Sequence, residues 1–388
     1  MRRGAAVLLS IAVLGVGSPQ AVGREPDIAC AVPVPGVLGE AGTGRVSGAG
    51  LDRVHRIATG AGVRVAVVDT GIADHPQFHG LVEGGDLVSP AAPDPLRDCD
   101  GHGTVVAGVI AARDGGIAPD ATLISIRQTS AHYRVDIDGD TTAGTLAGLS
   151  EAIHLALDAE ADVINISVVS CIRADLAATL DTTELDDALT RAEHHNTVIV
   201  AAAGNIGHDC HPGAVVNPAH APTVLAVSAI HPADPHGLAD YAMPAAADGP
   251  LAAPGVVSAG VSPAGHGWAA GLAGHAAGEV IAFEGTSFAA PVVTGTVALL
   301  RQRYPDETAA QLRERVSGAA EPGHGVVDPH AALTHLAADF TAPARELTVA
   351  AGESGAESPW QRFRRVLAAA GALVVAGLVA AGTLRRRG

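Results

Sequence analysis

Short apolar segments without a polar face recur through the middle of this chain. They cover Arg64 to Asp69, Leu123 to Ile126, Asp162 to Val168, Thr197 to Ala203 and Val224 to Ile230. A strand that is buried on both faces has such a continuous apolar pattern, and strands of this kind are typical of parallel sheets. We therefore predict that these segments are strands of a mainly parallel sheet.

Helical patterns occupy the segments that alternate with these strands. Within Ala143 to Ala159, one helical stripe holds Leu146, Leu149, Ile153 and Leu157. Further helices are predicted at His102 to Arg113, Asp181 to His195, Ser287 to Arg303 and Glu307 to Val316. Repeated strand–helix–strand units predict an α/β fold with right-handed crossovers. The stretch from Ala233 to Gly278 is rich in Gly, Pro and Ala, and we expect it to form loops.

The N-terminus has the pattern of a secretory signal peptide. Two arginines precede an apolar run at residues 5–16, and small residues follow at 21–23. We predict a signal peptide at residues 1–23 with cleavage after Gly23. The alternative is an uncleaved anchor, which the shortness of the run disfavours.

The C-terminus predicts a membrane anchor. Residues 366–384 carry no charge, and about 20 apolar residues suit one transmembrane helix. Arginines bracket the run like membrane-interface flanks, and a buried core helix is the alternative. We expect an exported protein in the cell membrane, with a single pass. Its main domain, residues 51–338, would lie on the extracytoplasmic side, followed by a polar linker (339–365), the membrane helix and a cytoplasmic tail (385–388).

Composition narrows the possible partners. With 388 residues, the chain suits one large domain with appendages. Apolar residues make up 48% and aromatic residues only 3%, so Ala, Val, Leu and Ile must build the core. The formal net charge of -17 argues against nucleic acid, because phosphate binding needs clustered positive charge.

Four cysteines agree with export, because disulfides persist outside the cytosol, and they allow three connectivities. Cys171 and Cys210 each follow a predicted strand, so they are neighbours if these strands are adjacent in the sheet. This position favours a Cys171–Cys210 bond and leaves Cys30 for Cys99, whereas four free thiols are the alternative. The Gly- and Pro-rich arm, residues 24–50, would then be stapled near His102.

Three motifs each place one catalytic residue type beside small residues. Asp69 lies in VVDTG, His102 in DGHGT and Ser287 in GTSFAAP, which is the most specific of the three. Serine is a weak nucleophile that needs a base within hydrogen-bond reach and a third group to orient that base. Asp69 ends a predicted strand, whereas His102 and Ser287 each open a helix. In this chain order the three motifs together resemble the subtilisin-like serine proteases.

The remaining parts of an active site come from this resemblance. Asn205 follows Ala-Ala-Ala-Gly, as does the family residue whose side chain completes the oxyanion hole, and a plain turn residue is the alternative. The second oxyanion donor would be the backbone N–H of Ser287, at a helix N-terminus that favours negative charge.

A second segment resembles the family's substrate-binding edge. It contains Ser167, Val168 and Val169, and Gly204 is a further candidate for substrate contact. In the family a Gly is common at the position of Val169. A branched side chain there is expected to narrow or reshape the primary pocket.

Finer details resemble the mycosins, membrane-anchored subtilisin-like proteases of actinobacterial type VII secretion systems. These details are Ile117 to Gln128, Arg97 to His102, Phe288, the short arm, the second cysteine pair and the C-terminal apolar run. The resemblance implies a subtilisin-like three-layer fold with a C-terminal transmembrane helix. It also implies protein or peptide substrates and subunits of the secretion membrane complex as partners. In that family the arm wraps the catalytic domain, in agreement with the staple.

Two clusters have metal-ligand residue types but fit metals poorly. His208-Asp209-Cys210-His211 is explained more simply as a disulfide loop than as a zinc site. Asp136, Asp138 and Asp140 alternate as in a calcium loop, but Gly139 and the lack of a trailing Glu do not fit. We expect neither a metal nor a cofactor.

The sequence leaves two hypotheses open. The first is an active serine endopeptidase with Ser287 as nucleophile, His102 as base and then acid, and Asp69 as the group that orients His102. The second is a structural subunit of a secretion complex in which proteolysis is slow or dispensable. A membrane anchor serves both.

Overall fold

A computed structural model describes residues 26–38, 48–133, 142–207, 210–231, 234–245, 250–336, 360, 363–371 and 373. The chain divides into two units, Met1–Ala337 and Ala338–Gly388. The predicted signal peptide and most of the predicted linker and membrane helix lie outside the described residues. Within the described part of the chain, no helix is long and apolar enough to cross a bilayer.

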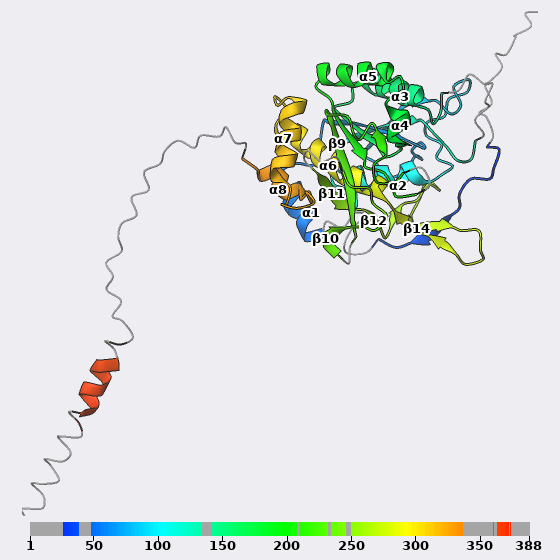
Figure 1. Cartoon of the computed structure of the whole chain (residues 1–388). Coiled ribbons are helices and arrows are strands. Elements are labelled where there is room, and N and C mark those ends of the chain that lie inside the picture. The colour runs from blue at the N-terminus through cyan, green and yellow to red at the C-terminus, as the bar shows by residue number, and fades with distance from the viewer. Residues whose placement is uncertain are drawn as a thin grey trace, which may run out of the picture. The chain divides into compact units, whose positions relative to one another are not determined.

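The first unit is built around a mainly parallel sheet (Figure 1). Its strands are β2 (Arg64–Asp69), β3 (Gly80–Asp86), β4 (Thr122–Arg127), β5 (Val163–Ile166), β7 (Val198–Ala202), β9 (Val224–His231), β10 (Asp234–Leu238) and β11 (Leu251–Pro254). They lie in the order β10-β9-β7-β5-β2-β4-β3, with β11 also beside β9. Every pair is parallel except β10 with β9. The predicted α/β fold is confirmed.

Apolar cores on both faces of the sheet explain the unbroken apolar pattern of its strands. Successive residues of β2 alternate between them: Val65 and Val67 join one core, and Ala66 and Val68 join the other. Helices α2 (His102–Ala111) and α6 (Thr286–Arg303) cover the first face. Helices α3 (Leu146–Asp158) and α5 (Thr183–His194) cover the second and lie together at the top of Figure 1. The domain is therefore three-layered, with the sheet in the middle.

Capping residues determine where the helices begin, and these starts differ from those that the apolar pattern predicts. Helix α3 begins at Leu146 because the Thr145 side chain accepts the N–H of Gly148. Helix α7 (Ala309–Ala319) begins where Thr308 and Gln311 form a capping box, rather than at Glu307. The described part of the first unit also contains α1 (Gly48–His55), α4 (Ala174–Ala177) and α8 (Pro329–Thr334).

The expectation of loops from Ala233 to Gly278 is wrong. This stretch contains β10, β11, β12 (Val256–Val257), β13 (Gly260–Val261) and β14 (Trp268–Ala273). Partners far away in the chain hold several of them: β14 pairs with β1 (Pro33–Gly36) of the arm, and β12 with β16 (Phe283–Glu284). Strand β14 also pairs with β15 (Val280–Ile281), and β6 (Ser170–Ile172) with β8 (Val215–Asn217). Strands of two to six residues give a period-two pattern little length in which to be detected.

Two disulfides fasten loops around the domain. Cys30 is joined to Cys99 and Cys171 to Cys210, the pairing that the strand positions favoured. The arm makes a further contact beside its disulfide, where the N–H of Ala31 donates to the carbonyl of Cys99 at 2.8 Å. A covalent bond and a strand pair therefore both hold the arm.

Replacing Cys30 and Cys99 together by Ser is expected to lower the free energy of unfolding by about 2–4 kcal/mol. The bond spans a sequence separation of 69 residues, and its loss frees that loop in the unfolded chain. Thermal unfolding followed by circular dichroism measures the effect. Reduced wild-type protein is the control and should also lose stability; equal Tm values for oxidised wild type and double variant would contradict the prediction.

Candidate active site

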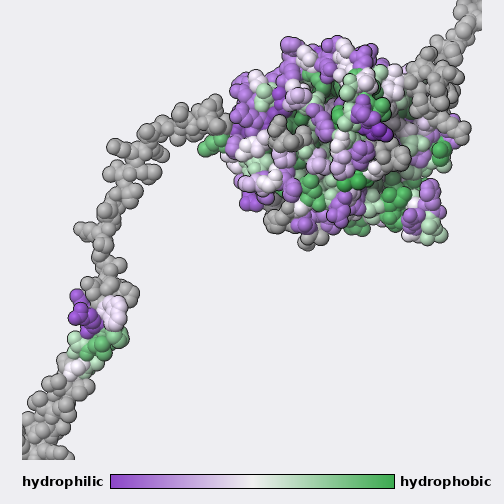
Figure 2. Space-filling view, viewed as in Figure 1, coloured by the Kyte–Doolittle hydropathy of each residue, from purple (hydrophilic) through white to green (hydrophobic). Residues whose placement is uncertain are grey.

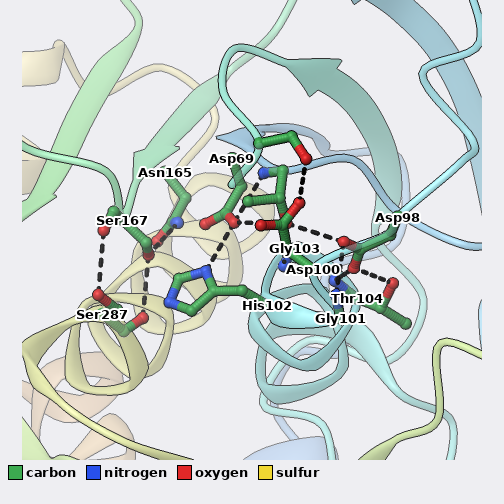
Figure 3. Close-up of polar contacts among 12 residues, drawn as sticks. Asp69, Asp98, Asp100, Gly101, His102, Gly103, Thr104, Asn165, Ser167 and Ser287 are labelled. Carbon is green, nitrogen blue, oxygen red and sulfur yellow. Dashed lines mark hydrogen bonds and ion pairs between the residues drawn. The ribbon is translucent and has the colours of Figure 1, made fainter. Parts of the chain in front are cut away.

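The end of β2 and the start of α2 meet in a short contact between a carboxylate and an imidazole (Figure 3). His102 Nδ1 lies 2.6 Å from Asp69 Oδ1. The Asp69 side chain is fully buried, whereas that of His102 is 28% exposed. Because a carboxylate accepts hydrogen bonds, the contact places the imidazole proton on Nδ1 and leaves Nε2 as a free base.

Glycine at position 103 allows this close approach. A Cβ there would lie 2.1 Å from the carbonyl oxygen of Gly71 and 3.1 Å from the Cβ of Asp69. Both contacts involve the chain at the end of β2, which the sheet holds in place. Any side chain at position 103 would therefore push His102 away from Asp69.

Ser287 lies in the first turn of α6 and makes a reciprocal pair of hydrogen bonds with Ser167. The Ser287 hydroxyl donates to the Ser167 carbonyl at 3.0 Å, and the Ser167 hydroxyl donates to the Ser287 carbonyl at 2.9 Å. Buried Asn165 supports Ser167 by donating from Nδ2 to its hydroxyl at 2.9 Å. Figure 3 shows the His102 imidazole between Asp69 and Ser287.

A phenylalanine packs against the imidazole of His102. The ring centroid of Phe288 lies 5.1 Å from that of His102 and 5.9 Å from that of Phe283. An aromatic ring at this distance excludes water from one side of the imidazole and restricts its tilt.

The orientation of Asn205 follows from its hydrogen bonds. Its side chain faces the backbone N–H of Thr286 at 2.9 Å and the Thr286 hydroxyl at 3.0 Å. Because a backbone N–H can only donate, the atom that faces it is Oδ1. The donor Nδ2 is then left to bind a ligand oxygen. Gly285 leaves room for it, since a Cβ there would lie 2.9 Å from Nδ2 and the φ of 153° favours glycine.

The predicted substrate-binding residues surround the same region. Val168 and Val169 line a cavity of about 300 Å³, together with Gln128, Thr129, Gly144, Thr145, Leu146, Leu149 and Ser170. The N–H of Gly204 donates to the Thr286 hydroxyl at 3.2 Å. The structure thus brings the predicted nucleophile, base, orienting group, oxyanion residue and substrate edge together.

Nearby carboxylates change the acid–base behaviour of His102. Burial alone would lower its pKa. The charge of Asp69, the hydrogen bond to Asp69 and the charges of Asp98 and Asp100 outweigh burial, so the pKa of His102 lies above its usual value. A general base must be neutral, so chemistry at Nε2 requires a pH above this raised pKa.

One buried carboxylate near the site received no role in the sequence analysis. Asp98, a buried carboxylate between the strand end and the helix start, was not singled out, although its place four residues before His102 is a possible signal. Among the described residues, no His, Cys, Asp and Glu side chains cluster as metal ligands. The three aspartates at 136–140 and His208-Asp209 lie outside the described residues.

A model of the Subtilase family matches residues 60–342. Mycosin-4 of Mycobacterium tuberculosis is 40% identical over 319 residues, which cover 74% of this chain and 68% of that protein. The crystal structure of MycP1 from Mycobacterium smegmatis has a TM-score of 0.71 at 33% identity and covers 83% of this chain and 93% of its own.

A further structural neighbour is a chain of an intact ESX-5 inner membrane complex. Its TM-score is 0.69 at 29% identity, with 91% of this chain and 93% of that chain covered. The chain belongs to the subtilase family and is a subtilisin-like serine endopeptidase. Within that family it is of the mycosin type.

Replacing Gly103 by Ala is expected to lower Tm and to weaken the Asp69–His102 contact, because the new Cβ would overlap the Gly71 carbonyl. Thermal unfolding and the NMR titration of His102 measure the two effects. Gly80→Ala is the control, since the nearest atoms to a Cβ there belong to the Thr122 side chain, at 3.3 Å or more. A Gly103→Ala protein with unchanged Tm and His102 titration would show that the close approach is not required.

Proposed function

We propose that this protein is a membrane-anchored serine endopeptidase that works with the membrane complex of a type VII secretion system. The observation that carries the catalytic part is the 2.6 Å contact between His102 Nδ1 and Asp69 Oδ1, beside Ser287 at a helix N-terminus. In this proposal Ser287 is the nucleophile, His102 the base and Asp69 the group that orients the base.

Acylation begins when Ser287 Oγ attacks the carbonyl carbon of a peptide bond and His102 Nε2 takes its proton. The resulting oxyanion accepts hydrogen bonds from Asn205 Nδ2 and from the backbone N–H of Ser287. One such donor stabilises the transition state by roughly 3 kcal/mol. His102 then gives its proton to the departing amine, which leaves an acyl group on Ser287. Water activated by His102 releases this group and restores the serine.

The resting position of the Ser287 hydroxyl differs from the attacking one. It donates to the carbonyl of Ser167, so its proton must turn toward His102 Nε2 before attack. Rotation about the Cβ–Oγ bond turns the proton, and rotation about the Cα–Cβ bond moves the oxygen between ordinary rotamers. A substrate N–H that binds the Ser167 carbonyl would compete with the hydroxyl and favour this rotation. Substrate binding and alignment of the nucleophile would then be coupled.

The lining of the cavity beside Val169 indicates which kind of substrate side chain fits there. The uncharged polar side chains in its lining are those of Gln128, Thr129, Thr145 and Ser170, and its apolar ones are those of Leu146, Leu149, Val168 and Val169. Burying a charged group without a partner is unfavourable. An uncharged substrate side chain is therefore preferred at this position, and Val169 limits its size.

The cellular role is proposed from the relatives and from the predicted membrane segment. Neighbours of this fold include chains of the ESX-5 inner membrane complex and of its periplasmic assembly. With the predicted anchor at 366–384, the catalytic domain would lie on the extracytoplasmic side, next to the complex. Protein or peptide substrates would meet it there.

Labelling with a fluorophosphonate tests the catalytic proposal. Wild-type protein should be labelled and Ser287→Ala should not, while the exposed Ser258→Ala is a control that keeps labelling. The rate should fall as the pH drops through the raised pKa of His102, because the protonated imidazole cannot accept the serine proton. If folded wild-type protein is not labelled, either with the arm intact or with it removed, the proposal that Ser287 is a catalytic nucleophile is refuted.

A structural role in the complex is the second candidate, favoured by the neighbours found in assembled complexes. It is separated from the first by comparing secretion in cells that carry Ser287→Ala with secretion in cells that lack the chain. If proteolysis is the essential task, both should lose secretion. Normal secretion with Ser287→Ala and loss with the deletion would assign the essential role to the scaffold.

A further inference from the structure

Asp98 is a buried carboxylate for which the proposed triad has no role. Only 9% of the residue is exposed. Its Oδ1 accepts the Thr70 hydroxyl and the N–H of Gly101, each at 2.8 Å. Its Oδ2 accepts the N–H of Thr104 at 2.8 Å and the Thr104 hydroxyl at 2.6 Å. Each oxygen thus receives one backbone N–H and one hydroxyl.

These partners belong to the two segments that must meet in the active site. Thr70 follows Asp69 and donates its N–H to Asp69 Oδ1 at 2.8 Å. The Thr70 hydroxyl also accepts the N–H of Gly103 at 2.9 Å, in the first turn of α2. Thr104 lies in the same turn, and its hydroxyl accepts the N–H of Ala73 at 2.9 Å. Asp98 therefore ties the chain after β2 to the start of the helix that carries His102 (Figure 3).

We propose that Asp98 is a positioning residue of the active site, which as a carboxylate holds Thr70 against Asp69 and fixes the first turn of α2 so that His102 meets Asp69. This inference rests on the proposed function, because it assigns Asp98 to the chemistry of His102. It goes beyond ordinary helix capping. Capping of α2 would need only the bond from the Thr104 N–H, whereas the bond from Thr70 leads directly to Asp69.

The donors around Asp98 fit its ionised form. Burial raises the pKa of its carboxyl, hydrogen bonds from Thr104 and Thr70 oppose this, and the charge of Asp69 raises it further, so the pKa is above its usual value. The two backbone N–H groups can only donate, however, and each faces a different oxygen. A carboxylate accepts from both and from both hydroxyls without leaving a donor unpaired.

A charge at this position also acts on His102. The carboxylates that raise the pKa of the imidazole are Asp69, Asp98 and Asp100. Asp100 is held by the Ser130 hydroxyl at 2.5 Å and the Ala131 N–H at 2.8 Å. Loss of the charge on Asp98 should therefore lower the pKa of His102. A residue that only stabilised the fold would not have this effect.

The segment that contains Asp98 is restrained by a disulfide and a hydrogen bond to the arm. Its neighbour Cys99 forms the disulfide to Cys30 of the arm. The Cys99 carbonyl accepts the N–H of Ala31 at 2.8 Å. The arm thus restrains the segment from which Asp98 reaches Thr70.

Asp98→Asn tests the proposal, because it keeps the side-chain size, removes the charge and turns one acceptor into a donor that faces a backbone N–H. We expect the fluorophosphonate labelling rate at neutral pH to fall about tenfold or more. The midpoint of the His102 titration, measured by NMR and assigned with His102→Ala, should move to lower pH by roughly half a unit to one unit. The acid limb of the labelling profile should move in the same direction.

One variant controls for destabilisation. Asp86→Asn removes another buried carboxylate, one that accepts the N–H groups of Val88 and Ser89 and pairs with the buried Arg127. It should lower Tm, but it should not move the His102 titration as Asp98→Asn does.

The possible results separate the two proposals. If wild type is not labelled, the proposed function fails, whereas the NMR titration still tests Asp98. If wild type is labelled and Asp98→Asn changes only Tm, or slows labelling without moving the His102 titration, the positioning role is refuted. If Asp98→Asn does not fold, Thr70→Val and Thr70→Ser decide: loss of labelling in the first and its retention in the second supports the proposal, and equal labelling overturns it.

Discussion

The contact between Asp69 and His102 is the constraint on which the rest of the site depends. Asp69 is fully buried, and among the described residues its Oδ2 has no hydrogen-bond partner. A buried carboxylate with an unpaired oxygen destabilises a fold unless its other interactions offset the loss of water. The sheet holds Asp69 in place because β4 and β5 flank β2 on both sides. His102 is brought to it by α2, and the absence of a side chain at Gly103 lets the two elements touch.

The active site is assembled from the ends of helices and strands, where polar groups can meet beside the apolar cores. Asp69 ends β2, His102 begins α2, Ser287 lies at the start of α6 and Asn205 follows β7. The interiors of these elements are apolar and buried, so the reacting groups can meet only where the elements stop. Figure 2 shows that hydrophilic side chains cover much of the visible surface of the domain, with apolar patches scattered between them. Helix N-termini at His102 and Ser287 add backbone N–H groups at this edge, and nearby side chains accept several of them.

The sequence was sufficient for the parts of the fold whose pattern is local and long. Strands β2, β4, β5, β7 and β9 are buried on both faces, and their continuous apolar runs indicated this directly. The motifs around Asp69, His102 and Ser287 indicated the residues of the site.

What the sequence could not indicate depends on partners far away in the chain. Strand β14 pairs with β1 of the arm, and β11 pairs with β9. Asp98 gains its role only from the meeting of Thr70 and Thr104 in space, and the Ser287 hydroxyl takes its direction from Ser167. No periodicity or motif records such contacts between loops.

The energetics of the site bear on the choice between enzyme and scaffold. Asp69 and Asp98 are two carboxylates buried within one hydrogen-bonded cluster, and each charge raises the pKa of the imidazole beside them. Apolar groups of similar size are often neutral or stabilising replacements for buried charges, so a domain kept only for its shape gains nothing from this cluster. The cluster does favour the tautomer of neutral His102 that carries its proton on Nδ1, and it stabilises the imidazolium that forms when Nε2 takes a proton. The arm and the predicted anchor bear on how the domain is held, whereas these buried charges favour the proposed proton transfer.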